Sequence, residues 1–244
     1  MDAKNITVVG DGAMATVCAE LLTGQGHHVT MWGPFAEHVE EMRQSRENRR
    51  YLPDLRLPDD MQLTADEAEA MDDAALIVSA IPTQYLRGVW KRFVSHTPAG
   101  VPIVSVTKGI ENESLLRPTQ VIADVLSERE EGGVRPVGAL SGPSIAAELA
   151  RRLPATVCVA SNDERFALML QEMFTTSWFR VYTNPDLLGV ELAAATKNVI
   201  ALAAGILDGL QAGNNAKSAL LSRGLAEITR LGVAMGAQQD TFFG

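Results

Sequence analysis

Cysteine is scarce in this chain of 244 residues, which contains only Cys18 and Cys158. Both lie in apolar runs, without a CxxC spacing or a nearby histidine cluster, so a disulfide framework is excluded and no zinc site is indicated. We therefore expect buried thiols in a reducing compartment and no bound metal. Histidine is also rare, and we expect all four at the surface, because they lie in turns or polar stretches: His27, His28, His38 and His96.

Positive charge and long apolar runs are also limited. The chain has 21 Lys and Arg against 30 Asp and Glu, a formal net charge of −9. Such a field repels nucleic acid and anionic membrane surfaces, so an anionic ligand must be captured locally. We find no signal-peptide pattern and no apolar run approaching the ~20 residues that cross a bilayer. We expect a cytoplasmic protein with no membrane span and no nucleic-acid partner.

The remaining composition is that of a folded globular protein. Hydrophobic residues make up 46% of the chain and charged residues 21%, which excludes a chain that is disordered throughout. The length exceeds the roughly 100–200 residues of one ordinary domain, so two domains, or one domain and part of another, are expected.

Strand-like and helical segments alternate through the first three quarters of the chain. A helical segment covers 13–22, and the strand-like segments, short and apolar, are 6–10, 28–32, 76–81, 102–106, 136–140 and 156–160. This alternation predicts a doubly wound, mostly parallel α/β sheet. After about residue 185 the pattern is helical, with expected interruptions at Gly205, Gly209 and the turn at Gly213. We predict one unit over 1–186 and the beginning of an all-helical unit over 187–244.

A glycine-rich turn joins the first strand to the first helix. Gly10 allows a tight turn, Gly12 lets a pyrophosphate approach the backbone, and Ala15 keeps the helix close to the strand, while Ala13 and Met14 open the helix. This GxGxxA pattern, in its strand-to-helix context, favours dinucleotide binding over a purely structural turn. The first unit is therefore predicted to be a dinucleotide-binding domain.

The sequence does not choose between NAD and NADP. An Asp or Glu is expected at the end of the second strand to bind the ribose of NAD, but Trp32-Gly33-Pro34 stands there. A cluster of arginines follows and could reach a phosphate, although such a cluster is more typical of a solvated helix face: Arg43, Arg46, Arg49 and Arg50.

One lysine, Lys197, interrupts the uncharged, alanine-rich run that opens the helical unit. If it is kept from water, desolvation favours its neutral form and it can act as a general base, with Asn198 orienting a substrate oxygen. The alternative is a lysine that reaches from a core helix into solvent. Two strand ends supply further candidates, Lys108 for an anion or carbonyl and Ser144 for hydroxyls, although either segment could be an ordinary turn.

Taken together, these motifs resemble the NAD(P)-dependent glycerol-3-phosphate dehydrogenases, particularly the bacterial type. The resemblance runs from residue 5 to 244, and the motifs that carry it follow the glycine turn in order: Asn48-Arg49-Arg50-Tyr51-Leu52-Pro53, Ile81-Pro82-Thr83-Gln84-Tyr85, Lys108-Gly109, Ser141-Gly142-Pro143-Ser144, Gly189-Val190-Glu191-Leu192, Lys197-Asn198 and Ser222-Arg223-Gly224-Leu225. It implies a Rossmann-like sheet followed by an incomplete all-helical domain.

The resemblance also implies roles for individual residues. Lys197 matches the proton acceptor for the C2 hydroxyl, with Asn198 beside it. Positions matching substrate contacts are Lys108, Gly142 and Ser144, and positions matching cofactor contacts are Ala13, Met14, Tyr85, Lys108 and Ala146. The implied reaction is hydride transfer between NAD or NADP and the phosphate substrate pair sn-glycerol 3-phosphate and dihydroxyacetone phosphate, supplying phospholipid synthesis.

Some positions depart from the family pattern. Pro34 stands where bacterial members have Arg or His near the 2′-phosphate of NADP, Met14 replaces an aromatic, and Ala15 replaces the third glycine. The family's Gly-Asp-Leu and Ser-Arg-Asn motifs, which grip the substrate phosphate, would lie beyond Gly244, so we expect a truncated chain. The alternatives are a non-catalytic dinucleotide-binding fragment and a 3-hydroxyacid or ketopantoate-type dehydrogenase. Exposed helical surface favours association, with a homodimer as one expectation.

Overall fold

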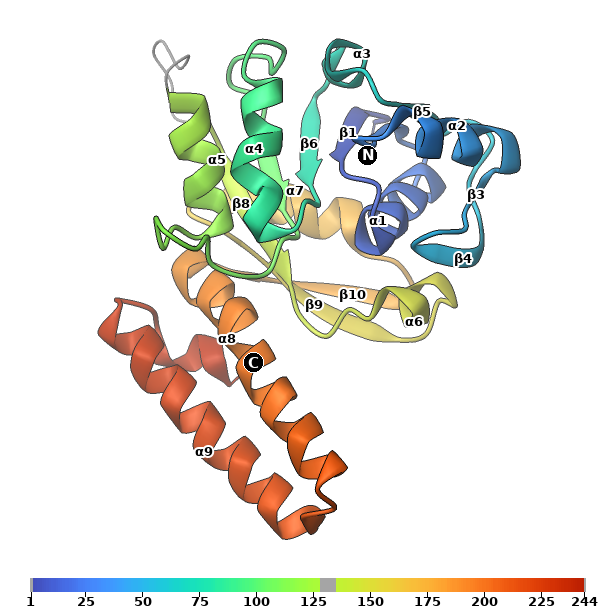
Figure 1. Cartoon of the computed structure of the whole chain (residues 1–244). Coiled ribbons are helices and arrows are strands. Elements are labelled where there is room, and N and C mark those ends of the chain that lie inside the picture. Colours follow the sequence, from blue (N-terminus) through green and yellow to red (C-terminus); the bar gives the residue numbers. More distant parts are fainter. Residues whose placement is uncertain (1, 128–134, 244) are drawn as a thin grey trace.

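The computed structural model describes residues 2–127 and 135–243. Within these ranges, eight strands form one sheet (Figure 1). Across the sheet they follow the order β10 (Phe179–Asn184), β9 (Ala155–Ser161), β8 (Val137–Ser141), β7 (Ile103–Ser105), β6 (Leu76–Ser79), β1 (Asn5–Val9), β2 (His28–Trp32) and β5 (Gln62–Thr64). All neighbouring pairs are parallel except β8 with β9. The predicted mostly parallel, doubly wound sheet is therefore confirmed.

Helices cover both faces of this sheet. Successive residues of a strand point to opposite faces, and the adjacent residues Val8 and Val9 of β1 accordingly belong to two different buried clusters. Val8 lies in the cluster that contains Leu22 of α1, whereas Val9 lies in the one that contains Trp90 of α4. The helices of this part are α1 (Ala13–Gly24), α2 (Ala36–Ser45), α3 (Glu67–Met71), α4 (Thr83–Phe93), α5 (Pro118–Leu126), α6 (Ala146–Ala150) and α7 (Glu164–Phe174).

The sequence pattern missed several short elements. Strands β5 and β10 were not expected, nor was the antiparallel hairpin of β3 (Glu47–Asn48) and β4 (Leu52–Arg56) that follows α2. The arginine cluster is not one solvated helix face, because α2 ends at Ser45 and Arg46 adopts a left-handed conformation with φ of 51°. The Arg46 guanidinium instead donates to the carbonyls of Pro58 and Met61. It thus fastens the hairpin region.

The expected surface position of the histidines was wrong for two of them. His27 is 5% exposed and His38 is 6% exposed. His27 accepts a hydrogen bond from the backbone of Lys4, and His38 lies on α2 with its ring edge against Tyr51. Local polarity suggested a surface position for both histidines. Instead, His27 packs beside the segment that precedes β1, and His38 packs beside the β3–β4 hairpin.

The C-terminal part is a helical hairpin of α8 (Leu187–Gly209) and α9 (Gly213–Ala234), followed by the short 3₁₀ helix η2 (Gln239–Phe242). Figure 1 shows α8 and α9 side by side, projecting away from the sheet. The expected interruption at Gly205 was wrong, because α8 continues through this residue. Helix α8 ends at Gly209 and α9 begins at Gly213, so one turn separates the two helices.

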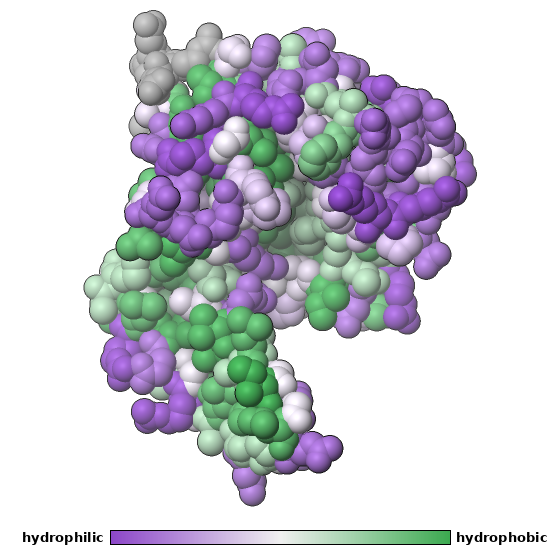
Figure 2. Space-filling model, in the orientation of Figure 1, coloured by the Kyte–Doolittle hydropathy of each residue, from purple (hydrophilic) through white to green (hydrophobic). Residues whose placement is uncertain are grey.

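Helix α8 also corrects the expectation about long apolar segments. It has 23 residues and is long and apolar enough to cross a membrane by length and composition alone, although only 22% of its most apolar window is buried. Its exposed apolar side chains recur along one stripe, at Val199, Leu202, Ile206 and Leu210. Figure 2 shows hydrophobic surface over this projecting part of the molecule. Helical structure was expected here, but its apolar length was not, because Glu191 and Lys197 divide the segment into shorter apolar runs.

Two buried carboxylates fix the beginning of α8. Asp186 caps the helix by accepting from the Gly189 amide at 2.8 Å, and it also accepts from the Gln238 amide and the Thr241 hydroxyl, each at 2.8 Å. Its two oxygens therefore tie the start of α8 to the segment around η2. This anchor sets where the following turns of α8 begin.

The second carboxylate, Glu191, connects α8 to the sheet unit. It is 3% exposed and accepts from the Thr119 amide at 2.9 Å, from the Thr119 hydroxyl at 2.7 Å and from Arg117 at 2.5 Å. Burial raises the pKa of Glu191, although these donors act in the opposite direction. Because a buried carboxylate is stable only when its oxygens are satisfied, this contact fixes α8 against the start of α5.

Candidate active site

The carboxyl ends of four neighbouring parallel strands, β8, β7, β6 and β1, meet at one edge of the sheet. This is the edge at which doubly wound sheets bind ligands. The turn after β1 requires glycine at its first position, because Gly10 has φ of +125° and a Cβ there would lie 2.7 Å from the carbonyl oxygen of Ala80. The predicted glycine turn therefore lies directly beside the end of β6.

The same turn leaves the beginning of α1 open. Gly12 is the N-cap of α1. Among the described residues, no side chain caps the helix, and no atom outside the adjoining backbone lies within 4 Å of a Cβ built at Gly12. Ala15 is fully buried and lets the helix pack closely on the sheet. Free amides and the positive end of the helix dipole suit a pyrophosphate, so the turn of Gly10, Gly12, Ala13, Met14 and Ala15 fits a dinucleotide.

Lys108 lies on a turn after β7 that is fixed by hydroxyl groups. Thr107 donates through Oγ1 to the Ile81 carbonyl at 2.7 Å, and Thr83 donates through Oγ1 to the Lys108 carbonyl at 3.0 Å. Gly109 has φ of +136°, and a Cβ there would lie 2.6 Å from Oγ1 of Thr83. The turns after β6 and β7 therefore clasp each other and hold Lys108 in place.

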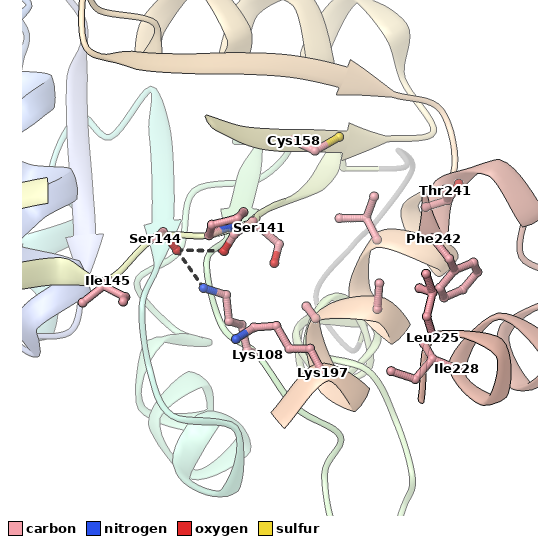
Figure 3. Close-up of a pocket in the computed structure, with 15 residues that line it drawn as sticks. Lys108, Ser141, Ser144, Ile145, Cys158, Lys197, Leu225, Ile228, Thr241 and Phe242 are labelled. Carbon is pink, nitrogen blue, oxygen red and sulfur yellow. Dashed lines mark hydrogen bonds between the residues drawn. The ribbon is translucent and has the colours of Figure 1, made fainter. Parts of the chain in front are cut away.

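The Lys108 side chain reaches the turn after β8. Its Nζ donates to Oγ of Ser144 at 2.8 Å, and Ser144 in turn donates to the Gly142 carbonyl at 3.2 Å (Figure 3). Gly142 is required there, because it has φ of +150° and a Cβ would lie 2.8 Å from Cα of Val157. Burial lowers the pKa of Lys108, and the positive charge of Lys197 lowers it further. The predicted residues Lys108, Gly142 and Ser144 thus form one hydrogen-bonded group.

Lys197 lies on α8 and faces this group, but it is exposed. Its Nζ donates to Oδ1 of Asn198 at 3.2 Å. The expectation that Lys197 is kept from water is therefore not met, and the desolvated lysine of the pair is Lys108. Figure 3 shows the ammonium groups of both lysines directed into the same space.

These side chains line a cleft of about 580 Å³ between the sheet edge and the helical hairpin. Lys108, Gly142 and Ser144 come from the sheet side, and Lys197 comes from α8. The opposite wall is apolar and includes Leu225, Ile228 and Phe242. None of the three was predicted as a site residue, although Leu225 belongs to the Ser222-Arg223-Gly224-Leu225 motif. A small polar anion with a short carbon skeleton suits such a cleft, because two cations and a hydroxyl face an apolar wall.

The structure does not bring every predicted site residue to this cleft. Tyr85 lies on α4 and is 69% exposed, and Ala146 is the first residue of α6. Neither lines the cleft, and neither do the residues of the glycine turn, which lie at the neighbouring strand end. Across 2–127 and 135–243, no group of three or more His, Cys, Asp or Glu side chains is arranged to hold a metal ion.

Comparison with known proteins places these features in one family. The family model for the N-terminus of NAD-dependent glycerol-3-phosphate dehydrogenase matches residues 5–167, and the model for the C-terminus of the same enzymes matches residues 186–244. A glycerol-3-phosphate dehydrogenase [NAD(P)+] of Geobacter sp. (strain M21) is 45% identical over 242 residues, which are 99% of this chain and 71% of that protein.

Two further relatives agree. A glycerol-3-phosphate dehydrogenase [NAD(P)+] of Bacillus pumilus is 46% identical, over 99% of this chain and 69% of its own length. The crystal structure of a glycerol-3-phosphate dehydrogenase from Coxiella burnetii superposes with a TM-score of 0.92 at 36% identity, covering 99% of this chain and 72% of that one. The likeness therefore extends over both the sheet and the helical hairpin.

Proposed function

Because the chain belongs to the NAD-dependent glycerol-3-phosphate dehydrogenase family, we propose that it transfers a hydride between NAD(P)H and dihydroxyacetone phosphate, forming sn-glycerol 3-phosphate for phospholipid synthesis. The observation that carries the proposal is the pair of Lys108 and Lys197 facing one cleft beside the glycine turn. Two ammonium groups attract a phosphate ester and also stabilise negative charge on a carbonyl oxygen. Family membership favours this substrate over a 3-hydroxyacid or ketopantoate.

The bound nicotinamide supplies or accepts the hydride. Lys197 donates the proton that the carbonyl oxygen needs when the ketone is reduced, and it accepts that proton from the C2 hydroxyl in the reverse direction. Its exposure supports this role, because solvent can return the proton between turnovers. Asn198, which accepts from Lys197, orients that ammonium group or the substrate oxygen.

Lys108, Gly142 and Ser144 are proposed to hold the substrate. The Lys108 ammonium is already oriented by Ser144 at 2.8 Å, so little conformational freedom is lost when an anion binds. Gly10, Gly12, Ala13, Met14 and Ala15 are proposed to bind the cofactor pyrophosphate. Tyr85 and Ala146 are also proposed to contact the cofactor, since they lie in the first turns of α4 and α6, the helices that follow β6 and β8.

Three broader features are also part of the proposal. The unit 1–186 binds the dinucleotide and 187–244 belongs to the helical substrate domain, supported by the end of β10 at Asn184 and the start of α8 at Leu187. A cytoplasmic location is supported by the two free thiols, Cys18 and Cys158. Homodimer formation is supported by the exposed apolar stripe of α8 and would be measured by light scattering after size exclusion.

The deciding experiment is oxidation of NADH and NADPH, followed by absorbance, in the presence of dihydroxyacetone phosphate. Turnover with either cofactor supports the proposal. Cofactor binding without any turnover supports instead the second function, a dinucleotide-binding module. The observation that favours this second function is that the residues of the glycine turn, such as Gly10 and Gly12, lie outside the cleft that holds the two lysines.

A further inference from the structure

The end of β2 lacks the acidic residue that usually binds the adenosine ribose in this kind of fold. Trp32 ends the strand and Gly33 follows it, with no carboxylate on either residue. The backbone of Gly10 nevertheless donates to the Trp32 carbonyl at 2.9 Å, so the glycine turn is fastened to this strand end. Any side chain between Gly10 and Gly12 is therefore held near the position at which the missing carboxylate would act.

That side chain is Asp11, and its carboxyl group occupies the space above Gly33. A Cβ built on Gly33 would lie 2.7 Å from Oδ2 of Asp11 and 3.0 Å from its Cγ. The end of β2 thus has no room for a side chain of its own while Asp11 keeps this conformation. A carboxylate from the neighbouring turn takes the place of one from the strand.

The position of Asp11 is fixed from the other side by the β3–β4 hairpin. Asn48 is fully buried, and its Nδ2 donates to the Asp11 carbonyl at 2.7 Å and to Oγ1 of Thr16 at 2.8 Å. The backbone that carries the carboxylate is therefore held independently of any ligand.

One oxygen of the Asp11 carboxyl group lacks a hydrogen-bond partner among the described residues. The residue is only 7% exposed, and the oxygen without a partner is Oδ2. The nearest cationic candidate, Nε2 of His38, lies 4.0 Å away, too far for a hydrogen bond, and is itself unpartnered among the described residues. Burial raises the pKa of Asp11, whereas His38, a hydrogen bond from the residue's own backbone amide and Arg50 act to lower it. A buried carboxylate oxygen without a hydrogen-bond partner is costly for the fold alone.

We infer that Asp11 binds the adenosine ribose hydroxyls of the cofactor and makes the protein selective for NAD(H) over NADP(H). This inference rests on the proposed function and names the cofactor of the same site. A ribose hydroxyl can donate to the carboxylate, whereas the 2′-phosphate of NADP(H) would bring a second negative charge to a poorly solvated position.

The nearby arginines are the competing observation, because they could neutralise a 2′-phosphate. However, Nε of Arg49 donates to Glu47 at 3.1 Å, and the Arg50 guanidinium lies over the Tyr51 ring, 5.2 Å from its centroid. Both arginines therefore already have a partner within the hairpin region. Preference for NADPH is therefore the outcome that would contradict the inference.

The test is fluorescence titration of the whole chain with NADH, NADPH and 2′-deoxy-NADH. Wild type is expected to bind NADH roughly ten- to hundredfold more tightly than either of the others, the range expected for a hydrogen bond to a charged group. The comparison with 2′-deoxy-NADH needs no substitution and so remains valid if a variant fails to fold. Equal affinity for all three nucleotides, or tighter binding of NADPH, would overturn the inference.

The variants Asp11→Asn and Asp11→Ser then assign the effect to this residue. In folded protein, both are expected to reduce the preference for NADH over NADPH by about tenfold. The control Asp60→Asn removes the same charge from an exposed position and should leave the ratio unchanged. An unchanged ratio in both Asp11 variants contradicts the inference, whereas wild-type protein that binds none of the nucleotides contradicts the proposed function itself.

Discussion

Lys108 and Lys197 direct their ammonium groups into the same cleft, although 88 positions of the chain separate them. Lys108 is held by Ser144 and is partly buried, whereas Lys197 is exposed on α8. The two lysines therefore differ in solvation although they share one space. This difference supports the different tasks proposed for them, since a fixed cation suits anion binding and a solvated one suits proton exchange with water.

Replacing Lys197 with Ala is expected to lower turnover by about 10²–10⁴-fold, the range for loss of a general acid or base. NADH affinity should remain within about twofold of wild type, because the glycine turn is untouched. Steady-state kinetics and fluorescence titration measure the two effects. Lys91→Ala, which removes an exposed lysine from α4, serves as the control. Turnover near the wild-type rate in Lys197→Ala would show that this lysine does not carry the proton.

Binding of dihydroxyacetone phosphate is expected to weaken as the pH rises toward the ordinary lysine range. The pKa of Lys108 is lowered by burial and by Lys197, so Lys108 loses its positive charge at a lower pH than an exposed lysine, whose pKa is about 10.4. Calorimetry from neutral to alkaline pH measures the dissociation constant.

The variant Lys197→Met provides the matched comparison for this pH profile. Removing the neighbouring charge raises the pKa of Lys108, so the loss of affinity should move to higher pH even though overall affinity falls. A profile that stays at the same pH in this variant would contradict the coupling between the two lysines.

The variant Glu191→Ala is expected to lower the free energy of unfolding by about 3–5 kcal/mol, because it leaves Arg117 and the Thr119 amide without their buried partner. Chemical denaturation followed by circular dichroism measures the change. The exposed pair of Arg230 and Glu227 supplies the control, since Glu227→Ala should cost less than about 1 kcal/mol. Equal effects of the two substitutions would mean that Glu191 does not anchor α8.

The variant Gly10→Ala is expected to destabilise the protein by at least about 1–3 kcal/mol and to abolish NADH binding, because Gly10 has φ of +125° and a Cβ there would meet the Ala80 carbonyl at 2.7 Å. Thermal unfolding and nucleotide titration check the two effects. Gly205→Ala is the control, and it is expected to change the stability in the opposite direction. Gly205 lies inside α8 with nothing within 4 Å of its Cβ position, so alanine should stabilise the helix by about 0.5–1 kcal/mol. Normal NADH binding by Gly10→Ala would show that cofactor binding does not depend on glycine at this turn.

Much of the sheet could be predicted because its signals are local. The run 28–32 coincides with β2, and the glycine turn was placed between β1 and α1 as the structure has it. Parallel strands that are buried on both faces are apolar throughout, which makes them easy to find. Strands β5 and β10 escaped prediction because they lie at the two edges of the sheet and carry mixed polar and apolar residues.

The candidate site was predictable in part for the same reason. Lys108 and Ser144 follow predicted strands, so their common edge follows from the parallel topology. The exposure of Lys197 did not follow, because an alanine-rich helix has no local signal that says which face is covered. The burial of His38 was missed because a hairpin distant in sequence covers it.

The sequence by itself determined the alternation of strands and helices, the dinucleotide-binding turn and the family, since each is encoded in short runs with a definite period or spacing. Only the tertiary structure decided that Lys108 is the partly buried lysine and Lys197 the exposed one, and that the Asp11 carboxylate stands over Gly33. These relationships depend on how β2, the β3–β4 hairpin and α8 pack, and on the Glu191 contact that fixes α8. Packing brings together residues distant in the chain, so their solvation and charge environment cannot be assigned from neighbours in sequence.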